Sequence, residues 1–440
     1  MKNTFVISCP IDTYSGYGAR SRDFVKALIE LDEYDVQILP QRWGKCSEGF
    51  IEQNSEWGFL SKHLIPQLMA KPDYWCQITV PNEFQPVGKY NIGLTAGIET
   101  TICDGSWIEG CNRMDLILTS SKHSQNVFLT TEFLKDGKED QVIKLTKPIE
   151  VLMEGLNLDV YKKITKFTNK DLYNEIDSIP EDFAYLNVGH WMSGEIGEDR
   201  KNIGLTVKSF YELFKNKKIT PALILKCSII NNSIMDKSEI LRRINIIRET
   251  VQDAKTLPKI YILHGNFSDS EMNELYNHPK IKSMISLTKG EGFGRPLLEF
   301  SSIGKPIIAS NWSGHIDFLK DVCFVEGELD NVHQSSAVKN MILAESKWFR
   351  PELSGIGYSL NNVWEDYKNW LKTSKIQESF SRDNFSFNNM KLQIKDIFIK
   401  NLKPLPKKMD LKIGKINMPK KPTKIPKLKN FSPFFIIVEV

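Results

Sequence analysis

Short apolar strands alternate with helical patterns along most of this chain, and this alternation limits the possible folds more than any other feature. In the first half, strand patterns occur at 5–8, 36–39, 91–95 and 116–119, and helical patterns at 20–31 and 120–128. In the second half, strand patterns occur at 183–189, 222–226, 260–263 and 283–287, with helical patterns at 203–214 and 240–251. Parallel strands need a crossover connection, usually a helix, so these repeats predict an α/β protein with parallel sheets.

The stretch 290–299, with the sequence GEGFGRPLLE, has the layout of a ligand site. It follows the predicted strand 283–287, and its three glycines leave little bulk, so backbone N–H groups can approach a ligand closely. Pro296 suits the first position of a helix, and Gly304 suits its end. The free N–H groups and the dipole of a helix N-terminus favour negative charge, so this layout predicts an anion site.

Two carboxylates, Glu291 and Glu299, stand eight positions apart in this stretch. An ionised carboxylate only accepts hydrogen bonds, which suits it to paired sugar hydroxyls. The alternative is structural, with Glu299 in the first turn of a helix and paired with Arg295 at i,i+4. That alternative explains neither the three glycines nor Glu291.

These residues, together with 304–310 (GKPIIAS), resemble the retaining GT-B glycosyltransferases, especially glycosyltransferase family 4 and its Glu-x7-Glu motif. The resemblance implies that Glu291 holds the donor sugar and that Glu299 holds the ribose. It also assigns loop residues to donor binding: Gly290, Gly292, Phe293 and Gly294. Arg295 departs from the apolar residue usual at its position, which indicates a different donor sugar or acceptor.

The resemblance implies a GT-B fold, in which two Rossmann-like domains face a cleft and a C-terminal helix crosses back to the first domain. A chain of 440 residues also exceeds what one hydrophobic core holds. We expect the junction in the charged, poorly periodic sequence 162–181, and the crossing helix to include 363–371. The expected division is an acceptor-side domain 1–170, a nucleotide-sugar domain 180–345, a crossing-back helical segment 346–399 and a basic Pro/Lys-rich tail 400–440.

Arg200 and Lys201 lie just before the predicted helix 203–214, where two cations oppose the helix dipole and need another explanation. A diphosphate supplies one, because Arg offers a fork of donors and Lys a point charge. In the resembling family, a basic pair here neutralises the leaving nucleotide diphosphate. A solvated surface pair is the alternative. His190 stands where many relatives carry an arginine, before a long acidic loop.

Gly16 and Gly18 follow the first predicted strand and match the family's first loop, where backbone amides reach the phosphates. They do not form a dinucleotide fingerprint, because Ser21 occupies the place of the third glycine. The pair therefore counts as a donor-binding candidate only within a two-sheet protein.

Glu99 follows the strand 91–95 and is a candidate to orient the acceptor hydroxyl or to balance positive charge on the reacting sugar. A plain surface glutamate is the alternative. His264 and Gly265 fall where the family holds the donor base, although a lone histidine at a strand end is more often structural. His315 and Asp317 lie on the next loop, and their use in the site is left open.

The resemblance implies a hexosyl- or pentosyltransferase that uses a nucleoside diphosphate sugar, with a UDP-sugar as the expected donor. The sequence has no Asp-x-Asp pair, no His-x-x-His and no Walker lysine loop, which disfavours a metal site and phosphoryl transfer from ATP. No other cofactor is expected. Seven scattered cysteines without a Cys-x-x-Cys pair predict reduced thiols in a cytoplasm.

The segment 400–430 carries eleven lysines and one acid, Asp410, so the remainder of this chain of net charge +4 is acidic. Its prolines exclude a continuous helix, and we expect an extended, mobile tail whose apolar end, 434–438, prefers a docking site to water. Lysines that neutralise phosphates drive nucleic-acid binding. The acceptor could therefore be hydroxymethylated phage DNA, as for some GT-B enzymes; an anionic membrane would also attract this segment.

Three tryptophans of the first half are candidates to stack on an extruded base, and buried core is the alternative for each: Trp43, Trp75 and Trp107. A glycan, lipid or protein acceptor stays open. A non-catalytic protein that binds nucleotide sugars or DNA is the runner-up for the whole chain.

Overall fold

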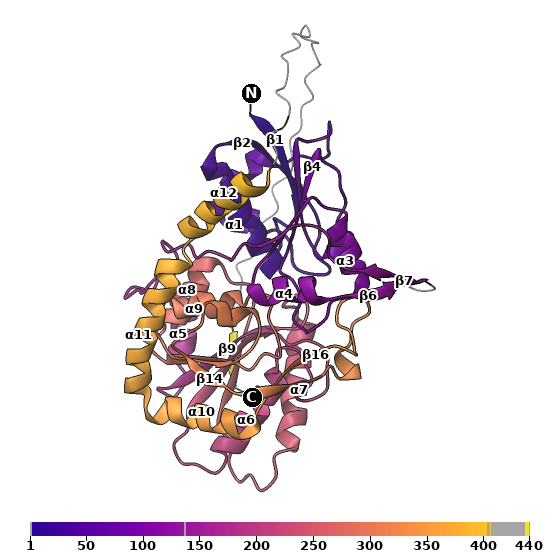
Figure 1. The fold of residues 1–440 in the computed structure, drawn as a ribbon. Helices are drawn as coiled ribbons and strands as arrows, with labels where there is room; N and C mark the ends of the chain where they lie inside the picture. Colours follow the sequence, from indigo (N-terminus) through magenta and orange to yellow (C-terminus); the bar gives the residue numbers. More distant parts are fainter. Residues whose placement is uncertain (1, 136–137, 403–404, 406–435, 440) are drawn as a thin grey trace.

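The computed structural model describes residues 2–135, 138–402, 405 and 436–439 and consists of two lobes, each built on one sheet (Figure 1). The first lobe holds a six-stranded parallel sheet in the order β2-β1-β3-β4-β5-β8. Its strands are β1 (Asn3–Cys9), β2 (Tyr34–Pro40), β3 (Tyr74–Ile78), β4 (Tyr90–Thr95), β5 (Leu116–Thr119) and β8 (Ile149–Val151). Its helices are α1 (Gly16–Leu31), α2 (Phe50–Gln53), α3 (Gly105–Asn112) and α4 (Lys122–Thr130). A hairpin of β6 (Phe133–Lys135) and β7 (Lys138–Ile143) projects from this lobe (Figure 1).

The second lobe holds a seven-stranded sheet in the order β14-β13-β12-β9-β10-β11-β17, parallel except for the last strand. The strands are β9 (Ala184–His190), β10 (Ala222–Ser228), β11 (Ile260–His264), β12 (Ile281–Ser286), β13 (Ile307–Ser310), β14 (Cys323–Val325) and β17 (Ile436–Glu439). The helices between them are α5 (Lys170–Asp177), α6 (Ile203–Phe214), α7 (Ile234–Glu249), α8 (Asp269–Asn277) and α9 (Arg295–Ser301). A hairpin of β15 (Gly327–Asn331) and β16 (Lys347–Pro351) precedes α10 (Leu353–Glu365), α11 (Tyr367–Asn384) and α12 (Phe387–Asn401).

The central strands are mostly apolar and largely buried because helices cover both faces of each sheet. All four residues of β5 and all six of β4 are buried. The expected patterns at 116–119 and 203–214 coincide with β5 and α6, and most other predicted elements overlap an observed one. The junction 162–181 was expected to lack periodic structure, but it contains α5, whose Leu172 and Ile176 pack in the core of the second lobe.

The chain returns to the first lobe within the expected segment 346–399, but after residues 363–371. Residues 363–371 fall in α10 and α11, which pack on the second lobe, and the crossing occurs between α11 and α12. In Figure 1, α11 runs along the second lobe and α12 lies against α1. Met390, Ile394 and Phe398 of α12 join the core of the first lobe, so this lobe combines the N-terminal part of the chain with a helix that follows the second lobe in sequence.

The C-terminal strand β17 pairs antiparallel with β11 through the backbone, so the apolar end of the chain docks at a sheet edge. The Lys- and Pro-rich residues 406–435, with the expectation that they are extended and mobile, lie outside the described residues. Among the helices that the structure describes, none has the length and apolarity required to cross a membrane.

Candidate functional site

The glycine loop 290–294 connects β12 to α9 and lies against the first lobe. A Cβ atom at Gly290 would be 1.9 Å from the Glu99 carbonyl oxygen, and one at Gly292 would be 2.4 Å from the Ala96 carbonyl oxygen. Gly294 has φ +98°, a backbone conformation that L side chains rarely adopt. The first two glycines are therefore required by the contact between the lobes, a reason that the sequence alone did not show.

The loop before α6 carries Asp199, Arg200 and Lys201. The buried Asp199 carboxylate accepts hydrogen bonds from the backbone N–H of Ile203 at 3.0 Å and of Gly204 at 3.4 Å, so it caps the helix. This carboxylate offsets the unfavourable position of two cations at a helix N-terminus. Burial raises the pKa of Asp199 to about 6, although the two N–H groups lower it.

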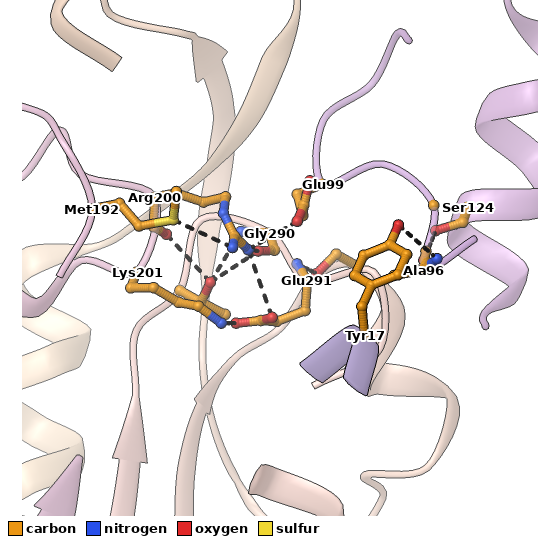
Figure 2. A network of polar contacts seen from close by, with 12 residues as sticks. Tyr17, Ala96, Glu99, Ser124, Met192, Arg200, Lys201, Gly290 and Glu291 are labelled. Carbon is orange, nitrogen blue, oxygen red and sulfur yellow. Dashed lines mark hydrogen bonds and ion pairs between the residues drawn. The ribbon is translucent and has the colours of Figure 1, made fainter. Parts of the chain in front are cut away.

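Arg200, Lys201, Glu291 and Glu99 form one polar network at the interface of the lobes (Figure 2). Arg200 Nη1 donates to the Gly290 carbonyl oxygen at 2.9 Å and lies 3.2 Å from Glu99 Oε1 and 3.7 Å from Glu291 Oε2. Lys201 Nζ pairs directly with Glu291 Oε1. Two cations from one loop are thus balanced by one carboxylate from each lobe.

The network keeps Glu291 ionised. Burial would raise its pKa, but Lys201 and Arg200 bring it down to about 2. Burial lowers the pKa of Lys201, and Glu291 opposes that shift. Burial also lowers the pKa of Arg200, but Glu99 and Glu291 outweigh it and the net shift is upward. The site therefore holds paired, poorly solvated charges, which interact strongly with an incoming anion.

Solved structures match this fold, whereas no family model and no curated protein matches the sequence. A glycosyltransferase from Rickettsia africae ESF-5 gives a TM-score of 0.58 at 16% identity, over 91% of this chain and 99% of that chain. HepE from Anabaena, solved with UDP and glucose, gives 0.58 at 11% identity, over 90% of this chain and 100% of that chain. Sucrose-phosphate synthase from Thermosynechococcus elongatus gives 0.58 at 10% identity, over 91% and 99%.

This chain has the GT-B fold. Its polar network lies where the two GT-B lobes meet, beyond the carboxyl ends of β9, β12 and β4. Ligands of open parallel sheets bind at this edge.

The first GT-B lobe contributes an aromatic pair beside the network. Tyr17, in the first turn of α1, shares a hydrogen bond of 2.9 Å with Thr95 Oγ1 and accepts one of 3.1 Å from the Ala96 N–H. Figure 2 shows this ring between α1 and the loop that carries Glu99. The ring of Trp43 stacks on Tyr17 with centroids 4.0 Å apart. Trp43 is half-buried, whereas the other two candidate tryptophans are buried in the core.

The other donor-binding candidates of the GT-B loops are placed differently from one another. Gly16 is exposed, with open space where a Cβ would be, and its neighbour Gly18 is required by the close Thr13 carbonyl oxygen. The Gly18 N–H already donates to Ser15 Oγ at 2.9 Å. The side chain of Phe293 packs against Phe318 in the core of the second lobe, so Phe293 contributes only its backbone to the surface of the glycine loop.

His264 and Gly265 end β11, two strands from the network. His264 Nε2 lies 2.9 Å from the Ser233 carbonyl oxygen, and the Gly265 carbonyl oxygen accepts a hydrogen bond of 2.7 Å from Lys226 Nζ. Burial lowers the pKa of Lys226 to about 8. Lys226 adds a third cation near this edge of the GT-B sheet, and sequence reasoning missed it because it lies within an otherwise apolar strand.

Glu299 lies outside the network of Lys201 and Glu291. One carboxylate oxygen accepts from Arg295 Nε at 2.9 Å and the other from the Tyr276 hydroxyl at 2.9 Å. The i,i+4 pair with Arg295 that the sequence allowed is therefore present. Burial raises the pKa of Glu299 to about 7, against the opposing effect of Arg295. The two carboxylates of the motif thus belong to separate clusters on one loop–helix unit.

Three remaining residues, His315, Asp317 and His190, have structural contacts. His315 is buried beneath the glycine loop, with Nε2 2.7 Å from the Ser310 carbonyl oxygen. Asp317 accepts a hydrogen bond of 2.8 Å from the Lys122 N–H of the first lobe. His190, at the end of β9, shares a hydrogen bond of 2.8 Å with Ser228.

Proposed function

We propose that this chain is a glycosyltransferase that moves a sugar from a nucleoside diphosphate donor, a UDP-sugar, to a hydroxyl acceptor with retention of configuration. The observation that carries the proposal is the pairing of Arg200 and Lys201 with Glu291 and Glu99 at the lobe interface of a GT-B fold. HepE, a structural neighbour, was solved in complex with UDP and glucose and also with UDP-glucose, which supports a UDP-sugar. The motif resemblance alone supports retention.

In the proposed reaction, the acceptor oxygen bonds to the anomeric carbon on the face from which the diphosphate leaves. The bond from that carbon to the phosphate oxygen breaks, and a phosphate oxygen takes the acceptor's proton, so no side-chain nucleophile is required. Arg200 and Lys201 stabilise the charge that grows on the leaving group. Glu99 is the more exposed partner of Arg200, with 24% of its side chain exposed against 10% for Glu291, so a diphosphate displaces Glu99 first.

Within this proposal, Glu291 holds the sugar hydroxyls and Glu299 the ribose. The amides of the glycine loop and of Gly16 lie near the phosphates, and the β11 end at His264 and Gly265 holds the base. Each oxygen of Glu299 already accepts one hydrogen bond, but an ionised carboxylate has about four acceptor positions. Ribose hydroxyls can therefore join Arg295 and Tyr276 without replacing them.

The test is a panel of nucleotide sugars screened by thermal shift, because a bound donor stabilises the folded state by mass action. Donors that raise the melting temperature are then assayed for transfer or hydrolysis by mass spectrometry. Glu299→Ala is expected to lower donor affinity severely. Normal turnover by that variant would overturn the site assignment, and an absence of turnover by wild type with every bound donor would favour a non-catalytic binding protein.

For the acceptor, we propose hydroxymethylated DNA on two observations. The segment 400–430 carries eleven lysines in the sequence. Trp43, stacked on Tyr17 beside the network, is the one candidate tryptophan that is not fully buried, and aromatic faces bind unstacked bases. Filter binding with duplex DNA over a salt series tests this class of acceptor. Each neutralised phosphate adds about 0.9 to the salt slope, so a shallow slope or no binding would exclude DNA.

A further inference from the structure

Arg295 is the centre of a second ionic cluster that joins the two lobes. Its Nη1 atom lies 2.5 Å from Asp23 Oδ2 and 3.2 Å from Glu154 Oε2, both in the first lobe, while Nε lies 2.9 Å from Glu299 Oε1. The guanidinium is 13% exposed, and the three carboxylates are 6–8% exposed. This rigid, planar group therefore contacts both lobes at once in a site with little solvent.

The helix α1 presents buried charges to this cluster, although charged residues in a helix usually face solvent. Arg20, Arg22 and Asp23 are only 2–4% exposed. The two arginines donate to main-chain carbonyls of their own lobe, as Arg20 does to Met153 at 3.1 Å. Asp23 instead points across the interface to Arg295.

Arg295 also opposes the protonation of Glu299. Burial raises the pKa of Glu299, and the largest opposing effect is that of Arg295. Burial lowers the pKa of Arg295, but Asp23, Glu299 and Glu154 outweigh it, so the net shift is upward and the guanidinium stays charged. Without Arg295, a buried Glu299 would favour its protonated form and lose its acceptor-only character.

Glu154 lies next to the point where the chain passes between the lobes. The two crossings are hydrogen-bonded to each other, because the Leu156 N–H donates to the Phe385 carbonyl at 2.7 Å and the Phe387 N–H to the Leu156 carbonyl at 2.7 Å. A cavity of about 180 Å³ lies beside this hinge, with Glu154 and Ser386 in its lining. A movement of the lobes about these crossings changes the distance between Arg295 and its two first-lobe partners.

We propose that Arg295 is a positioning residue that couples closure of the two lobes to the orientation of Glu299. In the closed arrangement, Asp23 and Glu154 hold one side of the guanidinium, which directs Nε to Glu299. When the lobes separate, that restraint is lost. The proposal depends on the proposed function only for the contact between Glu299 and the donor.

The experiment compares Asp23→Asn, Glu154→Gln, Arg295→Met and Arg295→Lys with wild type. The first two variants are isosteric and keep the fold. Small-angle X-ray scattering measures the radius of gyration, calorimetry measures UDP affinity, and steady-state kinetics separate kcat from KM. We expect Asp23→Asn and Glu154→Gln to increase the radius of gyration and lower kcat about tenfold, with UDP affinity within about twofold of wild type.

Arg295→Met is expected to lower kcat and also UDP affinity, each about tenfold, because Glu299 loses its ionic partner. Arg295→Lys restores a positive charge beside Glu299 but not the planar set of N–H donors that contacts both lobes. We therefore expect UDP affinity to recover while kcat stays low. The matched control is Arg350→Met, which removes the 2.8 Å pair with Asp330 inside one hairpin and leaves the radius of gyration unchanged.

Unchanged scattering and kcat in Asp23→Asn and Glu154→Gln would overturn the coupling. The coupling would also be overturned if all four variants lost stability and their kcat and UDP affinity fell together. That result would describe a purely structural cluster. A failure of the proposed function is a different result, because wild type would then bind no UDP and turn over no donor while the scattering of the variants still reports on closure.

Discussion

Arg200 of the second lobe lies 3.2 Å from a carboxylate oxygen of Glu99 of the first lobe. This ion pair connects the loop that carries Arg200 and Lys201 in the second lobe to a carboxylate of the first lobe. Glu291, from the same lobe as Arg200, supplies the second balancing charge. A diphosphate entering between these groups meets two cations whose charges are already oriented, which reduces the reorganisation that binding requires.

Lys201→Met is expected to lower kcat/KM by about 10²–10³-fold, because the leaving diphosphate loses a cation in a site with little solvent. The measurement is release of UDP from the donor that the thermal-shift panel identifies. Lys201→Met/Glu291→Gln is the control for stability, since it also removes the carboxylate that Lys201 neutralised. Wild-type kcat/KM in Lys201→Met would remove the basic pair from the mechanism.

Gly290→Ala is expected to separate the lobes. The added methyl would be 1.9 Å from the Glu99 carbonyl oxygen, so the backbone must shift, and we expect a loss of about 1–3 kcal/mol in stability together with a larger radius of gyration. Gly357→Ala is the control, because its methyl meets nothing within 4 Å in the interior of α10. That variant should gain about 1 kcal/mol. Equal behaviour of the two variants would contradict the close contact.

The ionised state of Glu291 predicts an acid-sensitive contribution to stability. Its folded pKa of about 2 lies below the value of 4.5 for an unperturbed glutamate, so the contribution is complete above pH 4.5 and is lost as the pH falls toward 2. The free energies of unfolding of wild type and Glu291→Gln should therefore differ most near neutral pH, by up to about 3 kcal/mol, and converge in acid. Denaturant titrations across this range measure the difference; a constant difference would refute the ion pair.

Trp43→Ala is expected to raise the KM for the acceptor about tenfold and to leave UDP affinity unchanged, because stacking on one base contributes about 1–3 kcal/mol. Trp43→Phe keeps an aromatic face and should recover most of the loss. Kinetics with hydroxymethylated DNA and calorimetry with UDP separate the two effects. A change in UDP affinity alone would assign the ring to the donor.

The sequence predicted the elements that are both apolar and periodic. Residues 116–119 and 203–214 match β5 and α6 because every strand residue, and one face of the helix, is buried. It missed β3, whose five residues follow a long irregular stretch, and the hairpin of β15 and β16. Four of the five residues of β15 are exposed, so this strand has no apolar alternation to detect.

The sequence indicated candidate residues of the site but not the contacts between distant ones. Lys201 was assigned to a diphosphate and Glu291 to a sugar, and their ion pair was not anticipated because the residues are 90 positions apart. The i,i+4 pair of Arg295 with Glu299 was anticipated, but its first-lobe partners were not, because Asp23 lies 272 positions away within a helix where a charged residue indicates solvent. A run of buried charges in α1 is visible only once the second lobe is in place.

Helix α12 makes the first lobe depend on residues that are synthesised late. The core of the first lobe includes Met390, Ile394 and Phe398, which leave the ribosome after the whole parallel part of the second sheet. The lobe whose synthesis begins first therefore stays incomplete until most of the second lobe has been made. A fragment that stops before Phe387 would expose the apolar surface that α12 covers, so a soluble version of this lobe needs 387–401 joined to it.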